Sequence, residues 1–87
     1  MINKLIEEGK ELKRSTYDST GMGTMSECYD GPEFELWSSK VALFYQDQSE
    51  SVVRDKVLKR YSSLNARKSI EFHEIAIGAL KALQEMK

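Results

Sequence analysis

The feature that most constrains this chain is its last segment, residues 66–86, where polar residues follow a single narrow line. Their steps of three and four predict a helix, and they are Glu71, Glu74, Gly78, Lys81 and Glu85. Nearly all other positions are apolar: Ile70, Phe72, Ile75, Ala76, Ile77, Ala79, Leu80, Ala82, Leu83 and Met86. A helix with so wide an apolar surface is central in its domain or is covered by a partner.

Three further segments show helical periodicity. Residues 2–14 place Ile2, Leu5, Ile6 and Leu12 on one face, and Gly9 on or near that face would allow another backbone to approach closely. Residues 33–46 follow a start signal at Pro32, and a third helix runs to about Ser62 with Ser49 or Ser51 as its cap. With Asn65 or Ser62 capping the last helix, the sequence predicts one all-α domain, residues 1–87, with about four helices.

The single tryptophan, Trp37, lies in the middle of an apolar stripe on the second helix. A core aromatic is one interpretation of such a residue. The other is an interface through which the protein associates with itself or with a partner, because small domains gain stability from oligomerisation. The residues expected in that interface are Trp37, Phe72, Ile75 and Leu83.

Residues 15–32 differ in composition from the rest, with six Ser or Thr, three Gly and the only Pro, and with no Lys or Arg. No segment of the chain alternates convincingly between apolar and polar residues, so we expect no sheet. The sequence predicts a long loop between the first two helices, as a wrapped surface loop or as a binding loop. A short hairpin in this segment is the minor alternative.

Composition excludes several classes of protein. Thirteen basic and fourteen acidic residues nearly cancel, which disfavours a nucleic-acid binder. The longest uncharged apolar run, residues 41–45, is far too short for a membrane span, and acids stand where a signal peptide would need an apolar run. One cysteine and one histidine cannot form a Cys/His zinc site in one protomer. We therefore expect a complete cytoplasmic protein without metal or cofactor.

No motif indicates a reaction. Cys28 has Glu27 and Asp30 nearby, and acids raise the pKa of a thiol and weaken it as a nucleophile. His73 lies among apolar residues of the last helix, as a structural histidine would. The glycines at 21 and 23 lack the Gly-Lys-Ser/Thr ending of a phosphate-binding loop. We expect the protein not to be an enzyme.

The near-neutral charge hides a segregation: residues 15–39 hold five acids and no base, whereas residues 51–68 hold six bases and one acid. These patches are solvated helix faces, a surface for an acidic partner or a second copy, or an anion site. The third alternative places a phosphate at the start of the last helix. Its candidate ligand-binding residues are Lys59, Arg60, Tyr61, Arg67 and Lys68.

Three segments together suggest a family: LIEEGKEL at 5–12, GPEFELW at 31–37 and IGALKAL at 77–83. Their order resembles the small helical N-terminal domain that precedes TIR-like, nucleotide-binding and other effector domains in bacterial anti-phage defence proteins. The resemblance implies a phage-encoded inhibitor or decoy that acts on a host defence complex through protein contact and self-association. It equally admits an oligomeric sponge for an anionic nucleotide messenger, or an oligomerisation module of the defence system itself. No catalytic motif is shared, so the resemblance transfers no functional residue.

Overall fold

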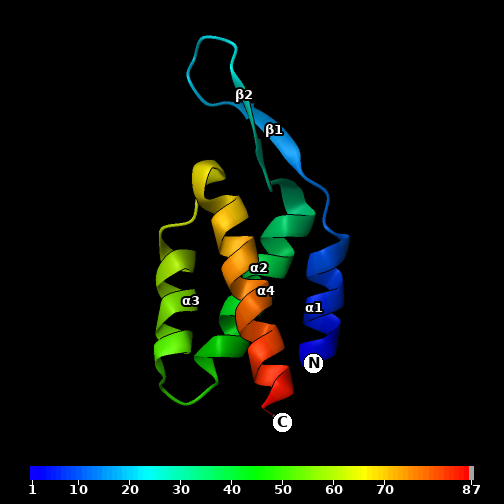
Figure 1. Ribbon diagram of the computed structural model, residues 1–87, viewed down its shortest axis with the longest axis vertical. Helices are drawn as coiled ribbons and strands as arrows, with labels where there is room; N and C mark the ends of the chain where they lie inside the picture. Colours follow the sequence, from blue (N-terminus) through cyan, green and yellow to red (C-terminus); the bar gives the residue numbers. More distant parts are fainter. Residues whose placement is uncertain (87) are drawn as a thin grey trace.

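The computed structural model describes residues 1–86, which form a bundle of four α-helices with a β-hairpin projecting from one end (Figure 1). The helices are α1 (Ile2–Glu11), α2 (Gly31–Gln46), α3 (Val52–Ser62) and α4 (Ser69–Glu85). They run alternately up and down, so that α1 packs against α2 and α4, and α3 packs against the same two helices. The four-helix prediction is confirmed.

The helix starts follow local signals in the sequence. The Ser51 hydroxyl accepts a hydrogen bond from the backbone N–H of Arg54 and so caps α3. Asn65 caps a short 3₁₀ turn, η1 (Ala66–Lys68), by accepting from the backbone N–H of Lys68. That turn makes α4 start at Ser69, three residues after the predicted start of the last helix.

The core is an aromatic cluster between α2 and α4. Phe72 of α4 is 1% exposed and meets both Phe34 and Trp37 edge to face. The indole N–H of Trp37 donates to the Leu5 carbonyl oxygen at 2.8 Å, which satisfies the polar atom of a buried ring. Gly9 makes this packing possible, because a Cβ there would lie 2.6 Å from the Trp37 ring. The close approach expected at Gly9 is therefore made by a side chain and not by another backbone.

The all-α prediction is wrong for the segment between α1 and α2. Strands β1 (Ser15–Asp18) and β2 (Met25–Cys28) pair in antiparallel fashion, Ser15 opposite Cys28 and Asp18 opposite Met25. The predicted loop 15–32 is thus mostly a hairpin, and α1 ends at Glu11 instead of residue 14 because Leu12 is already extended. Most hairpin side chains are exposed, so no apolar alternation marked the strands.

The hairpin has an ordered tip. The carboxylate of Asp18 accepts hydrogen bonds from the backbone N–H groups of Thr20, Gly21 and Gly23. The two glycines have φ angles of +73° and +88°, a region that disfavours other residues. Arg67 of η1 donates to the Ser19 carbonyl oxygen at 2.8 Å, which ties the tip to the bundle.

Candidate binding surfaces

Three of the five residues predicted to bind an anion make contacts elsewhere in the chain. Arg60 forms an ion pair with Glu71 of α4, and the Arg67 guanidinium is engaged by the hairpin. The Tyr61 hydroxyl hydrogen-bonds with the Ser39 hydroxyl, and its ring packs at a tilt against Phe72. Lys59 and Lys68 have exposed side chains. Both arginines are therefore already committed to contacts within the chain.

The hollow nearest to these residues does not suit an anion. It has a volume of about 410 Å³ and lies between the start of α2 and the end of α3. Tyr61 is the only predicted anion-binding residue in its lining, which also contains Asp30 and Glu35. Two carboxylates beside the opening repel a phosphate, so the geometry lends the nucleotide-sponge alternative no support.

Two of the four predicted interface residues lie in the core. Trp37 is 2% exposed and Phe72 is 1% exposed, so neither can contact a partner of the folded chain. The wide apolar surface of α4 is covered by α1 and α3 of the same chain, which is why the interface prediction does not hold for these two. Ile75 is half-buried against the core, and Leu83 is half-buried near the end of α4.

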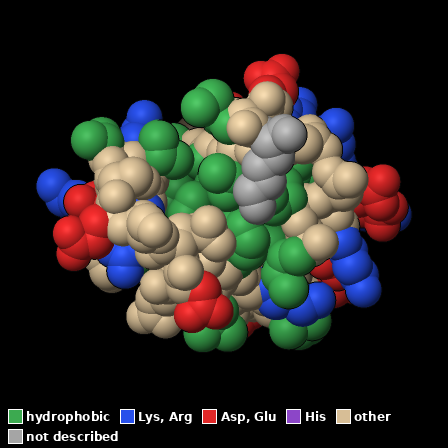
Figure 2. All heavy atoms as spheres, turned by 90° about the horizontal axis from the view of Figure 1, so that it is seen from below, with side chains coloured by type: hydrophobic (Ala, Val, Ile, Leu, Met, Phe, Trp, Pro, Cys, Tyr) green, Lys and Arg blue, Asp and Glu red, His purple; other side chains and the backbone are tan. Residues whose placement is uncertain are grey.

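Exposed apolar side chains gather at the end of the bundle where both termini lie (Figures 1 and 2). The space-filling view from this end shows hydrophobic side chains across the middle of the face. They belong to the start of α1, the end of α2, the start of α3 and the end of α4. The large and most exposed ones are Met1, Leu43, Val52, Val53 and Met86.

A groove between α1 and α2, here called the α1–α2 groove, is the more apolar of the grooves beside α1. Its volume is about 550 Å³, and its apolar lining comes from Met1, Leu5, Leu43 and Phe44. Leu43 is 64% exposed, and Leu36, which is 59% exposed, lies two turns earlier on the same stripe of α2. These leucines leave a strip of apolar surface in water.

Four charged side chains line the α1–α2 groove: Lys4, Glu8, Lys40 and Asp47. The Lys40 ammonium lies 3.2 Å from a carboxylate oxygen of Glu8, so these two form an ion pair. Lys4 on α1 and Asp47 just beyond α2 form no ion pair within residues 1–86. The groove therefore combines an apolar lining with one free charge of each sign.

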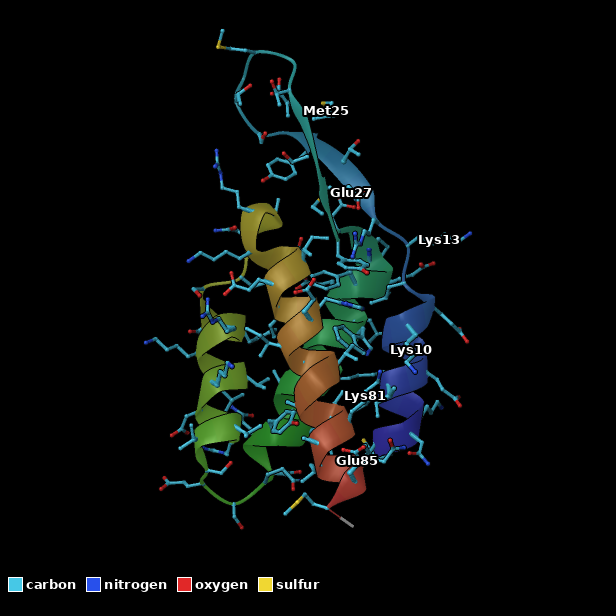
Figure 3. All side chains as sticks on the ribbon, in the orientation of Figure 1. Lys10, Lys13, Met25, Glu27, Lys81 and Glu85 are labelled. Atoms are coloured by element: carbon cyan, nitrogen blue, oxygen red, sulfur yellow. The ribbon has the colours of Figure 1, made fainter. Side chains whose placement is uncertain are left out.

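The opposite side of α1 is different. The groove between α1 and α4 is lined mainly by polar and charged side chains, among them Lys10, Lys81 and Glu85 (Figure 3). Ile6 is the only apolar side chain in its lining. The α1–α2 groove has the composition of a protein interface, whereas the groove between α1 and α4 does not.

A second apolar hollow, of about 330 Å³, lies where the end of α2, the α2–α3 connection and the end of α4 meet. Tyr45 lines it and is 3% exposed. Its hydroxyl is the one buried side-chain polar atom of the described chain that has no hydrogen-bond partner. Burial raises the pKa of this hydroxyl to about 12. A buried donor left unpaired costs about 1–3 kcal/mol, so packing alone does not explain why a hydroxyl stands here.

Cys28 and His73 have structural positions. Cys28 is fully buried, and this burial, with Asp30 nearby, raises the pKa of its thiol. His73 Nε2 lies 2.8 Å from the Gly9 carbonyl oxygen, and its ring stacks on Tyr29 at 4.3 Å. Neither residue faces a partner with which it could carry out nucleophilic catalysis.

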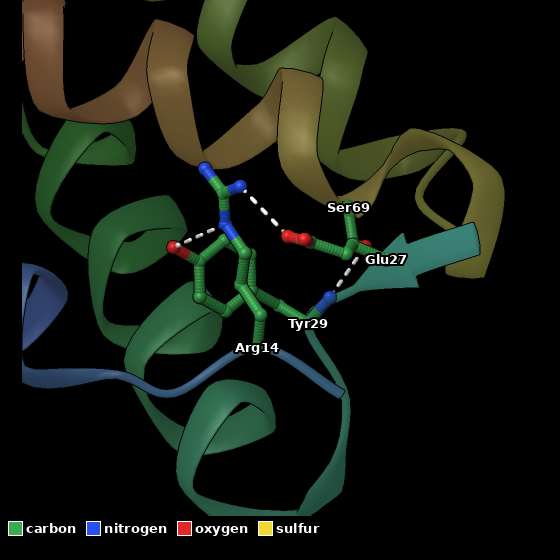
Figure 4. Close-up of polar contacts among 4 residues, drawn as sticks. All are labelled: Arg14, Glu27, Tyr29 and Ser69. Carbon is green, nitrogen blue, oxygen red and sulfur yellow. Dashed lines mark hydrogen bonds and ion pairs between the residues drawn. The ribbon is translucent and has the colours of Figure 1, made fainter. Parts of the chain in front are cut away.

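Polar contacts join the hairpin to the bundle (Figure 4). Arg14 donates to the Glu27 carboxylate at 2.8 Å and to the Tyr29 hydroxyl at 3.5 Å. The backbone N–H of Tyr29 donates to the buried Ser69 hydroxyl at 2.8 Å. These contacts hold the hairpin in place against the bundle.

Residues 1–86 contain no cluster of three metal-binding side chains, and none of their helices is long and apolar enough to span a membrane. No protein-family model, curated protein or solved structure matches this chain.

Sequence reasoning named Leu83, which lines the hollow beside Tyr45, as an interface residue, but it singled out no other lining residue of either apolar hollow. Leu36 and Leu43 are seven residues apart, and this spacing marks a line on α2 that is separate from the stripe of Trp37. Their distance from the Trp37 stripe was the feature of the sequence that could have indicated a second apolar surface. Nothing local distinguishes Tyr45 from a tyrosine whose hydroxyl has a partner.

Proposed function

We propose that this protein is a non-catalytic binding protein that associates with a second copy of itself through the α1–α2 groove. The observation that carries the proposal is the composition of that groove: an apolar lining that reaches solvent at Leu43, flanked by one free cation and one free anion. An exposed apolar surface of this kind marks a site of association.

A second copy fits the groove because its charges are self-complementary. In a dimer with two-fold symmetry, the same patch faces itself in reversed orientation. Lys4 of one protomer then faces Asp47 of the other, and the pair occurs twice in each dimer. Like charges facing one another would oppose this arrangement, and the free charges of the groove are of opposite sign.

The biological setting of the proposal comes from the resemblance to anti-phage defence proteins. A phage-encoded dimer that occupies a site on a host defence complex is the setting we propose. An oligomerisation module of the defence system is the alternative. Purification of tagged protein from infected and uninfected bacterial cells tests it, and failure to recover any defence component would contradict it.

Self-association is tested by sedimentation velocity across a concentration series. Leu43→Glu places a charge in the apolar groove, and we expect it to yield a monomer where the wild type is a dimer. Met22→Glu, at an 88% exposed position on the hairpin tip, is the matched control and should leave the dimer intact.

A charge exchange tests the geometry of the dimer. Lys4→Glu alone and Asp47→Lys alone each place like charges opposite one another and should weaken association. The double variant restores opposite charges and should recover most of it. A wild type that is monomeric throughout the series, or a Leu43→Glu variant as dimeric as the wild type, would contradict the proposal.

A further inference from the structure

We propose that the hollow beside Tyr45 binds a small, uncharged and mostly apolar molecule whose hydrogen-bond acceptor is taken up by the Tyr45 hydroxyl. A neutral carbonyl compound is the chemical class that fits. This site is separate from the α1–α2 groove, since only Gln48 lines both.

The unpaired hydroxyl is the first observation. Tyr45 is packed in the core, where phenylalanine would fill nearly the same volume without an unsatisfied polar atom. The hydroxyl is therefore retained at a cost in stability. A ligand with an acceptor would supply the partner that the described residues do not.

The shape and lining of the hollow are the second observation. Its α4 wall has two alanines, Ala79 and Ala82, and their small side chains leave room between α4 and the end of α2. Val53, Leu83 and Met86 complete the apolar lining. A volume of about 330 Å³ lies at the lower end of the range for ligand sites, which suits a fragment of one ring.

The charges around the hollow select a neutral ligand. Within residues 1–86, its lining contains no lysine or arginine, and its one charged residue is Glu50, so a carboxylate or phosphate would be repelled. Arg54, which lies close by, donates to the Tyr45 carbonyl oxygen at 3.0 Å and pairs with Asp55 at 3.5 Å. The phenol is a neutral donor at physiological pH already at the ordinary tyrosine pKa of 10.0, and burial raises the pKa of Tyr45 to about 12.

Access to the hydroxyl requires a side chain to move. Met86 is 84% exposed and lies just beyond the last turn of α4. Its unbranched side chain can change rotamer at little cost.

The first test uses the protein without ligand. Tyr45→Phe removes a hydroxyl that has no partner, so we expect a melting temperature equal to or above that of the wild type. A lower melting temperature would mean that the hydroxyl is already satisfied in the folded protein, and it would overturn the proposal.

The second test compares two probes of similar shape, cyclohexanone and methylcyclohexane, by NMR titration of the Ala79 and Ala82 methyl groups. Wild-type protein should bind the ketone about three- to tenfold more tightly, as expected for one neutral hydrogen bond. Tyr45→Phe should lose this preference, and Ala82→Leu should lose binding of both probes. No shift with either probe, or an unchanged preference in Tyr45→Phe, would overturn the proposal. Both tests are independent of dimerisation, because Leu43→Glu should bind the ketone like the wild type.

Discussion

The bundle and the hairpin are stabilised by different interactions. In the bundle, aromatic and aliphatic side chains interlock around Trp37 and Phe72, and Gly9 allows the tryptophan ring to reach α1. In the hairpin, order comes from hydrogen bonds, such as those made by Asp18 and Arg67, and from the ion pair between Arg14 and Glu27. The hairpin side chains are mostly exposed and contribute little apolar burial.

This difference shows where binding sites are to be sought. The composition of residues 15–32 suggested a binding loop, but the polar groups at the base of the hairpin are already paired with one another. The bundle is the opposite case, because it leaves Leu36, Leu43 and Met86 exposed and one hydroxyl unpaired at Tyr45. The hairpin also exposes Met22 and Met25, but the unpaired buried hydroxyl lies in the bundle.

The largest expected effect on stability is the contrast between alanine substitutions at two glycines of the bundle, Gly9 and Gly78. Gly9→Ala places a methyl group 2.6 Å from the Trp37 ring and 2.7 Å from the Ile77 side chain, and it should lower the free energy of unfolding by about 1–3 kcal/mol. Gly78→Ala, on an exposed face of α4 with nothing within 4 Å, should raise it by about 0.5–1 kcal/mol. Urea denaturation followed by circular dichroism measures both.

The decisive result is that the two substitutions change the free energy of unfolding in opposite directions. If both variants were stabilised, the tryptophan ring would not pack on Gly9. Both variants gain the same helix propensity, so the difference between their free energies of unfolding, about 1.5–4 kcal/mol, reports the packing of the core alone.

A smaller effect is expected at the junction of the two regions. Ser69 is 1% exposed and accepts from the Tyr29 backbone N–H at 2.8 Å. Ser69→Ala leaves that buried N–H without a partner and should cost about 1–2 kcal/mol. Ser62→Ala removes an exposed hydroxyl that bonds only the Lys59 carbonyl oxygen, and it should change stability by less than about 0.5 kcal/mol. Equal effects of the two substitutions would show that the junction does not depend on this bond.

The helices and much of the core were predictable because helical periodicity reports which face is buried. The stripe of polar residues on the last helix placed Phe72 and Leu80 on the apolar side, and both are buried. Trp37 was open to two interpretations, core aromatic or interface, and it is a core aromatic. A wide apolar helix face must be buried, and helices of the same chain or another chain can both bury it. Here α1 and α3 provide it.

The hairpin was only the minor alternative for residues 15–32, and the two hollows were not predicted, for related reasons. The strands of the hairpin bury little, so they lack the alternation that marks a half-buried strand. Their pairing depends on the turn that Asp18 organises and on the distant residues Arg67 and Ser69. The two hollows depend on which helices pack against one another. Local sequence patterns do not predict that packing.

The smallest expected effect is confined to the hairpin tip. Backbone hydrogen bonds from Gly23, and further ones from Thr20 and Gly21, hold the pKa of the Asp18 carboxyl below its usual value of 3.8. Because the folded pKa is the lower one, the carboxylate favours the ordered tip at neutral pH. That contribution is lost as the pH falls through the folded pKa.

NMR should show the amide signals of Gly21 and Gly23 moving together below pH 3.8 in the wild type. In Asp18→Asn, these signals should be shifted at neutral pH and should not titrate, while the signals of the bundle stay unchanged. Titration of the glycine amides at or above pH 3.8 would mean that the tip is not held by this carboxylate.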